Sequence, residues 1–98
     1  AKKCEAMEGL IQESQSAIED TDQGTATRDV ALIIAAQKVE HYEIASYGSL
    51  VQLAKTMGHD DMAKVLQETL DEEKQADVLL TELAVSGINL TAGNEPEE

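Results

Sequence analysis

Two long segments with helical periodicity, joined by a link of only two to four residues, constrain the fold of this chain more than any other feature. The first segment spans about residues 26–57 and the second about residues 61–86. Gly58 is suited to stop the first helix and Asp60 to cap the second. Because the link is so short, the two helices are predicted to pack as an antiparallel hairpin.

Each of these segments carries an unbroken seam of residues at alternating spacings of three and four. Each seam is apolar at its ends and polar in its middle, and each has one carboxylate on it. The first seam consists of Val30, Ile33, Gln37, Glu40, Ile44, Tyr47, Val51 and Ala54, and the second of Met62, Leu66, Thr69, Glu73, Ala76, Leu80 and Leu83.

The remainder of the chain is predicted to add a short helix and a tail. Apolar residues at helical spacing predict a helix over about residues 3–18, and the polar run 19–24 ends in Gly and predicts a loop. Gly87 is expected to end the last long helix. The sequence thus predicts one all-α domain over residues 3–87, followed by an acidic flexible tail over residues 88–98.

The charge balance of the chain excludes several classes of partner. Twenty acidic residues stand against seven basic ones, a formal net charge of −13, which disfavours nucleic acid and anionic lipid. No apolar run approaches the roughly 18 to 20 residues of a membrane span, and a single Cys excludes an internal disulfide. We therefore expect a cytoplasmic protein with no membrane or nucleic-acid partner.

The core available to this chain is thin, because its only aromatic residues are two Tyr. A hairpin with one short helix buries too little apolar surface to be a stable monomer. The chain also begins Ala-Lys-Lys without a Met. We therefore expect either a piece of a longer protein or a homodimer that completes its core by pairing.

A carboxylate on an apolar seam is costly unless a metal or a basic partner compensates it. Counted from the turn, Glu40, Glu43, Glu73 and Asp77 all fall within roughly one helical turn of depth at 1.5 Å per residue. Hard oxygen ligands suit iron, manganese or magnesium rather than a thiolate metal. These four residues are the predicted metal ligands; the competing interpretation is that they lie exposed at the edge of a bundle.

Three motifs resemble one protein family: Val-Glu-His-Tyr-Glu-Ile-Ala-Ser-Tyr-Gly-Ser-Leu over residues 39–50, Glu-Thr-Leu-Asp-Glu-Glu-Lys-Gln-Ala-Asp over 68–77, and Cys-Glu-Ala-Met-Glu-Gly-Leu-Ile over 4–11. They resemble the YciF-type family of bacterial ferritin-like proteins. The resemblance implies a cytoplasmic, stress-related four-helix bundle, often dimeric, with a dinuclear metal site like that of rubrerythrin. The biochemical activity of the family is not well established.

The family pattern includes two further long helices before the segment at residues 4–11, so this chain resembles its C-terminal half. By the match, Glu40 is the third-helix ligand and Glu73 the fourth-helix ligand. Related sites often have a His after the fourth-helix Glu, and Asp77 stands nearest to that place here.

Three functions are compatible with these patterns. The first is a ferritin-like module that binds iron or manganese, suspected to be dinuclear, at a site completed by dimerisation or by the missing half. The second is a metal-free helical module that dimerises through its seams. The third, a redox enzyme built on the same site, has no sequence feature that specifies its substrate, so enzymatic activity stays undecided.

Overall fold

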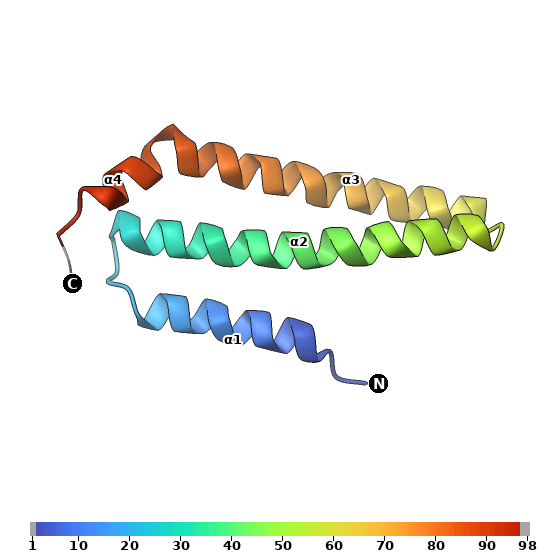
Figure 1. Ribbon diagram of the computed structural model, residues 1–98, viewed down its shortest axis with the longest axis horizontal. Helices are drawn as coiled ribbons and strands as arrows, with labels where there is room; N and C mark the ends of the chain where they lie inside the picture. Colours follow the sequence, from blue (N-terminus) through green and yellow to red (C-terminus); the bar gives the residue numbers. More distant parts are fainter. Residues whose placement is uncertain (1, 97–98) are drawn as a thin grey trace. The chain divides into compact units, whose positions relative to one another are not determined.

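A computed structural model describes residues 2–96 of the chain, and within that range the secondary structure is helical without a strand (Figure 1). The predicted all-α class, with two long helices and a shorter N-terminal one, is confirmed. None of the described helices combines the length and apolar character required to cross a membrane. The elements are α1 (Glu5–Glu19), α2 (Ala26–Thr56), α3 (Asp60–Leu83), the wide helical turn η1 (Ala84–Ile88) and α4 (Asn89–Gly93).

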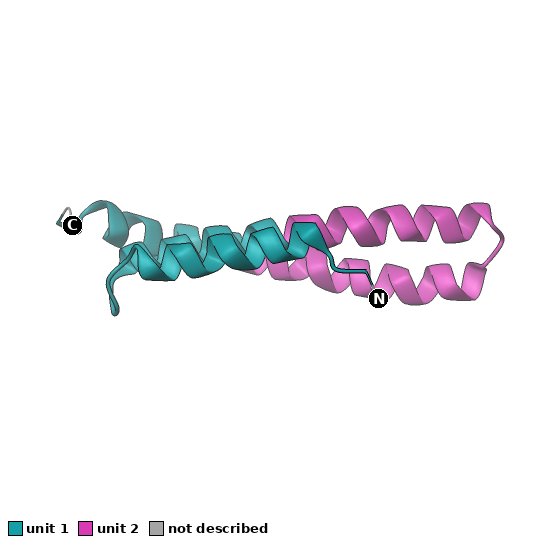
Figure 2. Cartoon of the chain, turned by 90° about the horizontal axis from the view of Figure 1, so that it is seen from below, with its two compact units in different colours: residues 1–39, 80–98 teal, residues 40–79 magenta. Residues whose placement is uncertain are grey.

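The chain divides into two compact units, coloured separately in Figure 2. One unit is formed by residues 40–79 and contains the end of α2, the turn and most of α3. The other is formed by residues 1–39 and 80–98, and contains α1, the start of α2, the end of α3 and the C-terminal elements. We call them the hairpin unit and the terminal unit, and describe each by itself.

The turn of the hairpin unit is a Schellman motif centred on Gly58. Gly58 has φ +76°, a left-handed conformation that a residue with a Cβ adopts only with strain. The Gly58 N–H donates to the Lys55 carbonyl at 3.1 Å, and the His59 N–H donates to the Ala54 carbonyl at 2.8 Å. This is the hydrogen-bond pattern that satisfies the last carbonyls of a helix and reverses the chain.

The interior of the hairpin unit is made of small and branched side chains. Val51 and Ala54 of α2 and Ala63 and Leu70 of α3 are all buried. On α2 these are residues of the predicted seam, and no residue of that seam is exposed.

On α3 the predicted seam is shifted. Its end residues Met62 and Leu83 are exposed, while Ala63 and Leu70, which lie next to seam positions, are buried. A small Ala at the contact lets two helices approach closely, so α3 is rotated to bring Ala63 inward rather than the larger Met62. Glu73 remains half-buried after this rotation.

In the terminal unit, one arginine joins α1 to the start of α2. The Arg28 guanidinium donates to the Ile18 carbonyl at 2.5 Å, to the Thr21 carbonyl, and to the Thr21 hydroxyl at 3.1 Å. These carbonyls lie at the C-terminal end of α1, where helix carbonyls lack partners within the helix. Thr25 caps α2, because its hydroxyl accepts from the Arg28 N–H at 3.1 Å.

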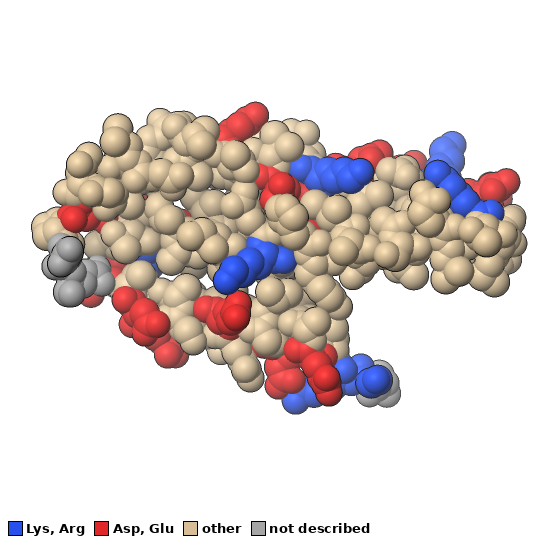
Figure 3. All heavy atoms as spheres, viewed as in Figure 1, with Lys and Arg blue, Asp and Glu red and all other residues tan. Residues whose placement is uncertain are grey.

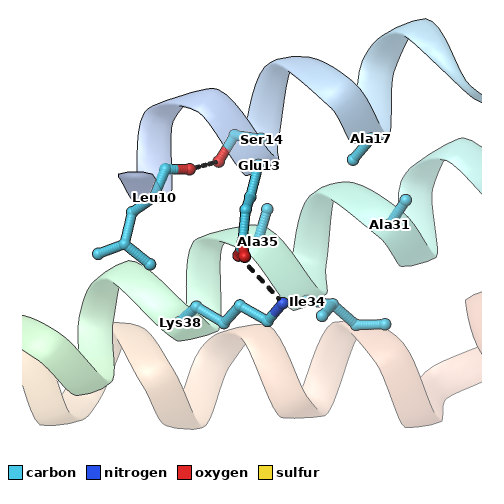
Figure 4. A pocket seen from close by; sticks show the side chains of 8 residues that line it. All are labelled: Leu10, Glu13, Ser14, Ala17, Ala31, Ile34, Ala35 and Lys38. Atoms are coloured by element: carbon cyan, nitrogen blue, oxygen red, sulfur yellow. Dashed lines mark hydrogen bonds and ion pairs between the residues drawn. The ribbon is translucent and has the colours of Figure 1, made fainter. Parts of the chain in front are cut away.

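A pocket of about 190 Å³ lies between α1 and α2 in the same unit (Figure 4). Half of its lining residues are small, and Ala17 of α1 faces Ala31 and Ala35 of α2. Lys38 reaches across its rim to Glu13, with 3.4 Å between Nζ and Oε2. Both side chains of this ion pair are exposed, so its contribution to stability is small.

The C-terminal segment differs from the flexible tail that the sequence predicts. Gly87, at φ +150°, bends the chain after α3, and α4 follows. The Glu95 carboxylate then accepts hydrogen bonds from the Ala26 N–H at 2.8 Å and the Thr27 N–H at 2.7 Å. A carboxylate at a helix N-terminus satisfies free N–H groups and interacts favourably with the helix dipole, which explains why this segment folds back. Residues 97–98 lie outside the described range.

Candidate metal centre

Three of the four predicted ligands converge in the hairpin unit. Glu40 and Glu43 lie one turn apart on α2, and Glu73 faces them from α3. One carboxylate oxygen from each of these residues lies within 4.8 Å of the others. All three residues are half-buried. We call Glu40, Glu43 and Glu73 the carboxylate triad.

The triad concentrates negative charge, and the pKa values of Glu43 and Glu73 are raised. Burial raises the pKa of Glu43, and the hydrogen bond and charge of Glu73 raise it further. The pKa of Glu73 is raised first by a hydrogen bond shared with Glu40, which requires a proton on one of the two carboxyls, and then by burial. A hydrogen bond with Glu43 offsets part of the effect on Glu73. The triad thus favours a bound cation, either a proton or a metal ion.

Two carboxylate oxygens of the hairpin unit are buried without a hydrogen-bond donor among residues 2–96. They are Oε2 of Glu40 and Oδ1 of Asp77. A buried oxygen without a donor costs roughly 1–3 kcal/mol, and more when the group is charged. The residues present therefore fit a divalent cation, which would satisfy the Glu40 oxygen directly.

Asp77, the fourth predicted ligand, lies beside the triad but is not grouped with it. Its Oδ1 lies 3.4 Å from Nδ1 of His41, an ion-pair distance. His41 lies one position off the α2 seam, and its side chain is 67% exposed. This pair could have been predicted from the sequence, because residues 41 and 77 are about equally far along the chain from the turn.

The donor set determines which ions can bind. Three carboxylates are hard ligands and suit iron, manganese or magnesium. Three protein oxygens are fewer than the six ligands that an octahedral site requires, so the triad by itself is part of a coordination shell. Within residues 2–96 no other group of three acidic, His or Cys side chains has this spacing.

Comparison with known proteins gives consistent matches over nearly the whole chain. The model of a family described as a domain of unknown function, DUF892, matches residues 1–93. Protein YciF of Escherichia coli K12 is 56% identical over 93 residues, which are 95% of this chain and 55% of that protein. A crystal structure of the E. coli stress protein YciF superimposes with a TM-score of 0.84 at 55% identity, covering 91% of this chain and 55% of that one. This chain spans about half the length of the relatives it matches.

Proposed function

The chain belongs to the DUF892 family, and from this premise we propose that it is a ferritin-like, stress-related protein that binds iron or manganese through the carboxylate triad. The observation that carries the proposal is the convergence of Glu40, Glu43 and Glu73 oxygens within 4.8 Å. The link to stress rests on the similarity to YciF of E. coli, which is described as a stress protein.

Each residue near the proposed site has a distinct role. Glu40, Glu43 and Glu73 supply the ligand oxygens, and the buried Oε2 of Glu40 is available for a direct bond. Asp77 lies at the edge of the site, where it orients His41 or joins the shell when a second ion is bound. A bound dinuclear iron or manganese centre would supply a redox-active Lewis acid; its remaining ligands would come from a second copy or from the other half of a longer chain.

Calorimetric titration tests this proposal. We expect Mn²⁺, or Fe²⁺ without oxygen, to bind the 98-residue chain in a saturable manner. The Glu40→Ala, Glu73→Ala double variant should lose this binding. The matched control is Glu68→Ala, Glu82→Ala, which removes the same charge from exposed positions of α3. Equal binding by the two double variants would contradict the proposal.

A metal-free structural module is the second candidate function. The observation in its favour is the closeness of the Glu40 and Glu73 oxygens, which lie within 4.8 Å of each other, because a shared proton can satisfy such a carboxyl pair without a metal. This candidate predicts that a chelator leaves the thermal stability of the purified protein unchanged. If the chelator lowers the melting temperature, the metal-free candidate is wrong and the metal-binding function is supported.

A further inference from the structure

The segment that follows α3 has neither charge nor a buried core. Residues 83–94 contain no charged side chain, so Glu95 is the first charge after Glu82. In Figure 3 the atoms over α4, at the upper left, are correspondingly tan. No residue of η1 or α4 is buried, and Val85 and Leu90 are 72% and 74% exposed. We call residues 84–96 the C-terminal strap; burial of its own side chains does not hold it in place.

A hollow of about 450 Å³ lies between the C-terminal strap and the start of α2. The α2 wall of this hollow is apolar, made of Val30, Ile33 and Ile34, and the strap contributes Ala84 and Ala92. Close-packed protein interiors contain few voids larger than a water molecule. The strap therefore covers an apolar stripe of α2 without packing closely against it.

The C-terminal strap has a pivot near its beginning. Just before the strap, the Gln37 side-chain amide of α2 donates to the Thr81 hydroxyl of α3 at 2.7 Å. Within η1, Gly87 at φ +150° interrupts the helical backbone. Glycine adopts such a conformation at little steric cost. The chain can therefore turn at Gly87 while the end of α3 stays tied to α2.

The far end of the C-terminal strap is held through Glu95. Its Oε2 accepts from the Ala26 N–H at 2.8 Å, and its Oε1 accepts from the Thr27 N–H at 2.7 Å and the Thr27 hydroxyl at 2.5 Å. The first N–H groups of a helix have no partner within the helix, so water can replace the carboxylate there. A segment with few buried contacts opens at a small cost in free energy. This contact can therefore break without unfolding the helices.

We propose that the C-terminal strap is a movable cover over the hollow, with Gly87 as its hinge and Glu95 as its latch. When Glu95 leaves the start of α2, the strap moves away and the apolar stripe that includes Val30 becomes accessible. In the closed state the chain covers this stripe with its own C-terminal segment. The proposal does not rest on the metal centre, because the strap belongs to the terminal unit and the carboxylate triad to the hairpin unit.

Amide exchange measured by NMR tests the latch. In the 98-residue chain, the Ala26 and Thr27 N–H groups should exchange with solvent at least about tenfold more slowly than in Glu95→Ala. The control, Glu82→Ala, removes the same charge from an exposed position of α3 and should change these rates by less than about twofold. Equal exchange in the parent and Glu95→Ala would overturn the role of Glu95.

Thiol labelling tests the movement of the strap. Val30→Cys places a thiol in the α2 wall of the hollow, and Cys4→Ser removes the exposed native thiol while keeping a good N-cap residue for α1. Adding Glu95→Ala should make labelling by a maleimide at least about fivefold faster, and adding Glu82→Ala should change it by less than about twofold. If amide exchange rises in Glu95→Ala but labelling does not, the strap stays in place and the proposal is wrong.

Alanine at two glycines of the strap tests the hinge. Gly87→Ala strains the closed state, because φ +150° is unfavourable for a residue with a Cβ, and should speed labelling by about threefold or more. Gly93→Ala is the control, since a Cβ at this α4 position meets no atom within 4 Å. Circular dichroism checks that every variant keeps its helix content. Equal labelling of the two alanine variants would overturn the assignment of Gly87 as the hinge.

Discussion

At the scale of single residues, Glu43 is in an electrostatically costly position. Its pKa is raised by burial and by Glu73, which means that ionised Glu43 is less favourable in the folded chain than in the unfolded one. Glu43→Gln removes the charge and keeps the shape. In EDTA at neutral pH, we expect this variant to have a higher free energy of unfolding than the parent, measured by urea denaturation.

The same substitution should act in the opposite direction on metal binding. An amide oxygen is a weaker ligand than a carboxylate, so Glu43→Gln should weaken Mn²⁺ binding by at least about tenfold. Glu68→Gln, at an exposed position of α3, is the control and should change neither quantity appreciably. A Glu43→Gln variant that is less stable in EDTA would show that this carboxylate has a structural role.

At the scale of elements, two glycines of α2 and its turn should respond oppositely to alanine. Gly58 has φ +76°, so Gly58→Ala should lower the free energy of unfolding by about 1–2 kcal/mol. Gly48 lies within α2, and a Cβ there would meet no atom within 4 Å. Gly48→Ala should therefore raise the free energy of unfolding by about 0.5–1 kcal/mol through helix propensity. Urea denaturation of both variants checks the prediction, and destabilisation of equal size in both would contradict it.

The contact between Glu95 and the start of α2 predicts a pH dependence. Hydrogen bonds from the Thr27 hydroxyl and the Ala26 N–H lower the pKa of Glu95. A lowered pKa contributes stability that is present above the unfolded value of about 4.3 and is lost as pH falls through the folded value. Glu95→Gln should therefore lower the melting temperature at neutral pH, and the difference from the parent should shrink below about pH 4.

The control for this pH effect is Glu82→Gln, an exposed residue of α3 that loses the same charge. Its melting temperature should differ from that of the parent by little at any pH. A Glu95→Gln difference that is the same at pH 7 and about pH 3 would show that the carboxylate charge is not what holds this segment.

The elements show what the sequence pattern could predict. Gly58 ends α2 as predicted, because its position needs a backbone that glycine adopts readily. Gly87 was expected to end the last long helix, but α3 ends at Leu83 and Gly87 lies within η1, where it bends the chain. The rotation of α3 was not predictable from its own pattern, because either Met62 or Ala63 could face inward and the choice depends on α2. The role of Glu95 depends on a contact across 68 residues, which leaves no local signal.

At the scale of the whole molecule, the candidate site was more predictable than the packing around it. Counting residues from the turn brought Glu40, Glu43 and Glu73 to one depth, and their oxygens do converge. Asp77 lies at the predicted depth, but the direction of its side chain depends on the rotation of α3. Its Oδ1 lies 3.4 Å from Nδ1 of His41. The distance of a residue from the turn follows from the helix rise alone, whereas the direction of its side chain depends on how the helix packs against its partner.

Metal should stabilise the chain as a whole, because an ion that binds only the folded state adds its binding free energy to that of folding. At a free Mn²⁺ concentration 100-fold above its dissociation constant, the free energy of unfolding should rise by about 2.7 kcal/mol. The gain should vanish in EDTA and be absent from the Glu40→Ala, Glu73→Ala variant, whereas the Glu68→Ala, Glu82→Ala control should retain it. Thermal denaturation with and without metal measures it. An equal gain in both double variants would place the bound ion elsewhere on this acidic surface, because only the first variant lacks triad oxygens.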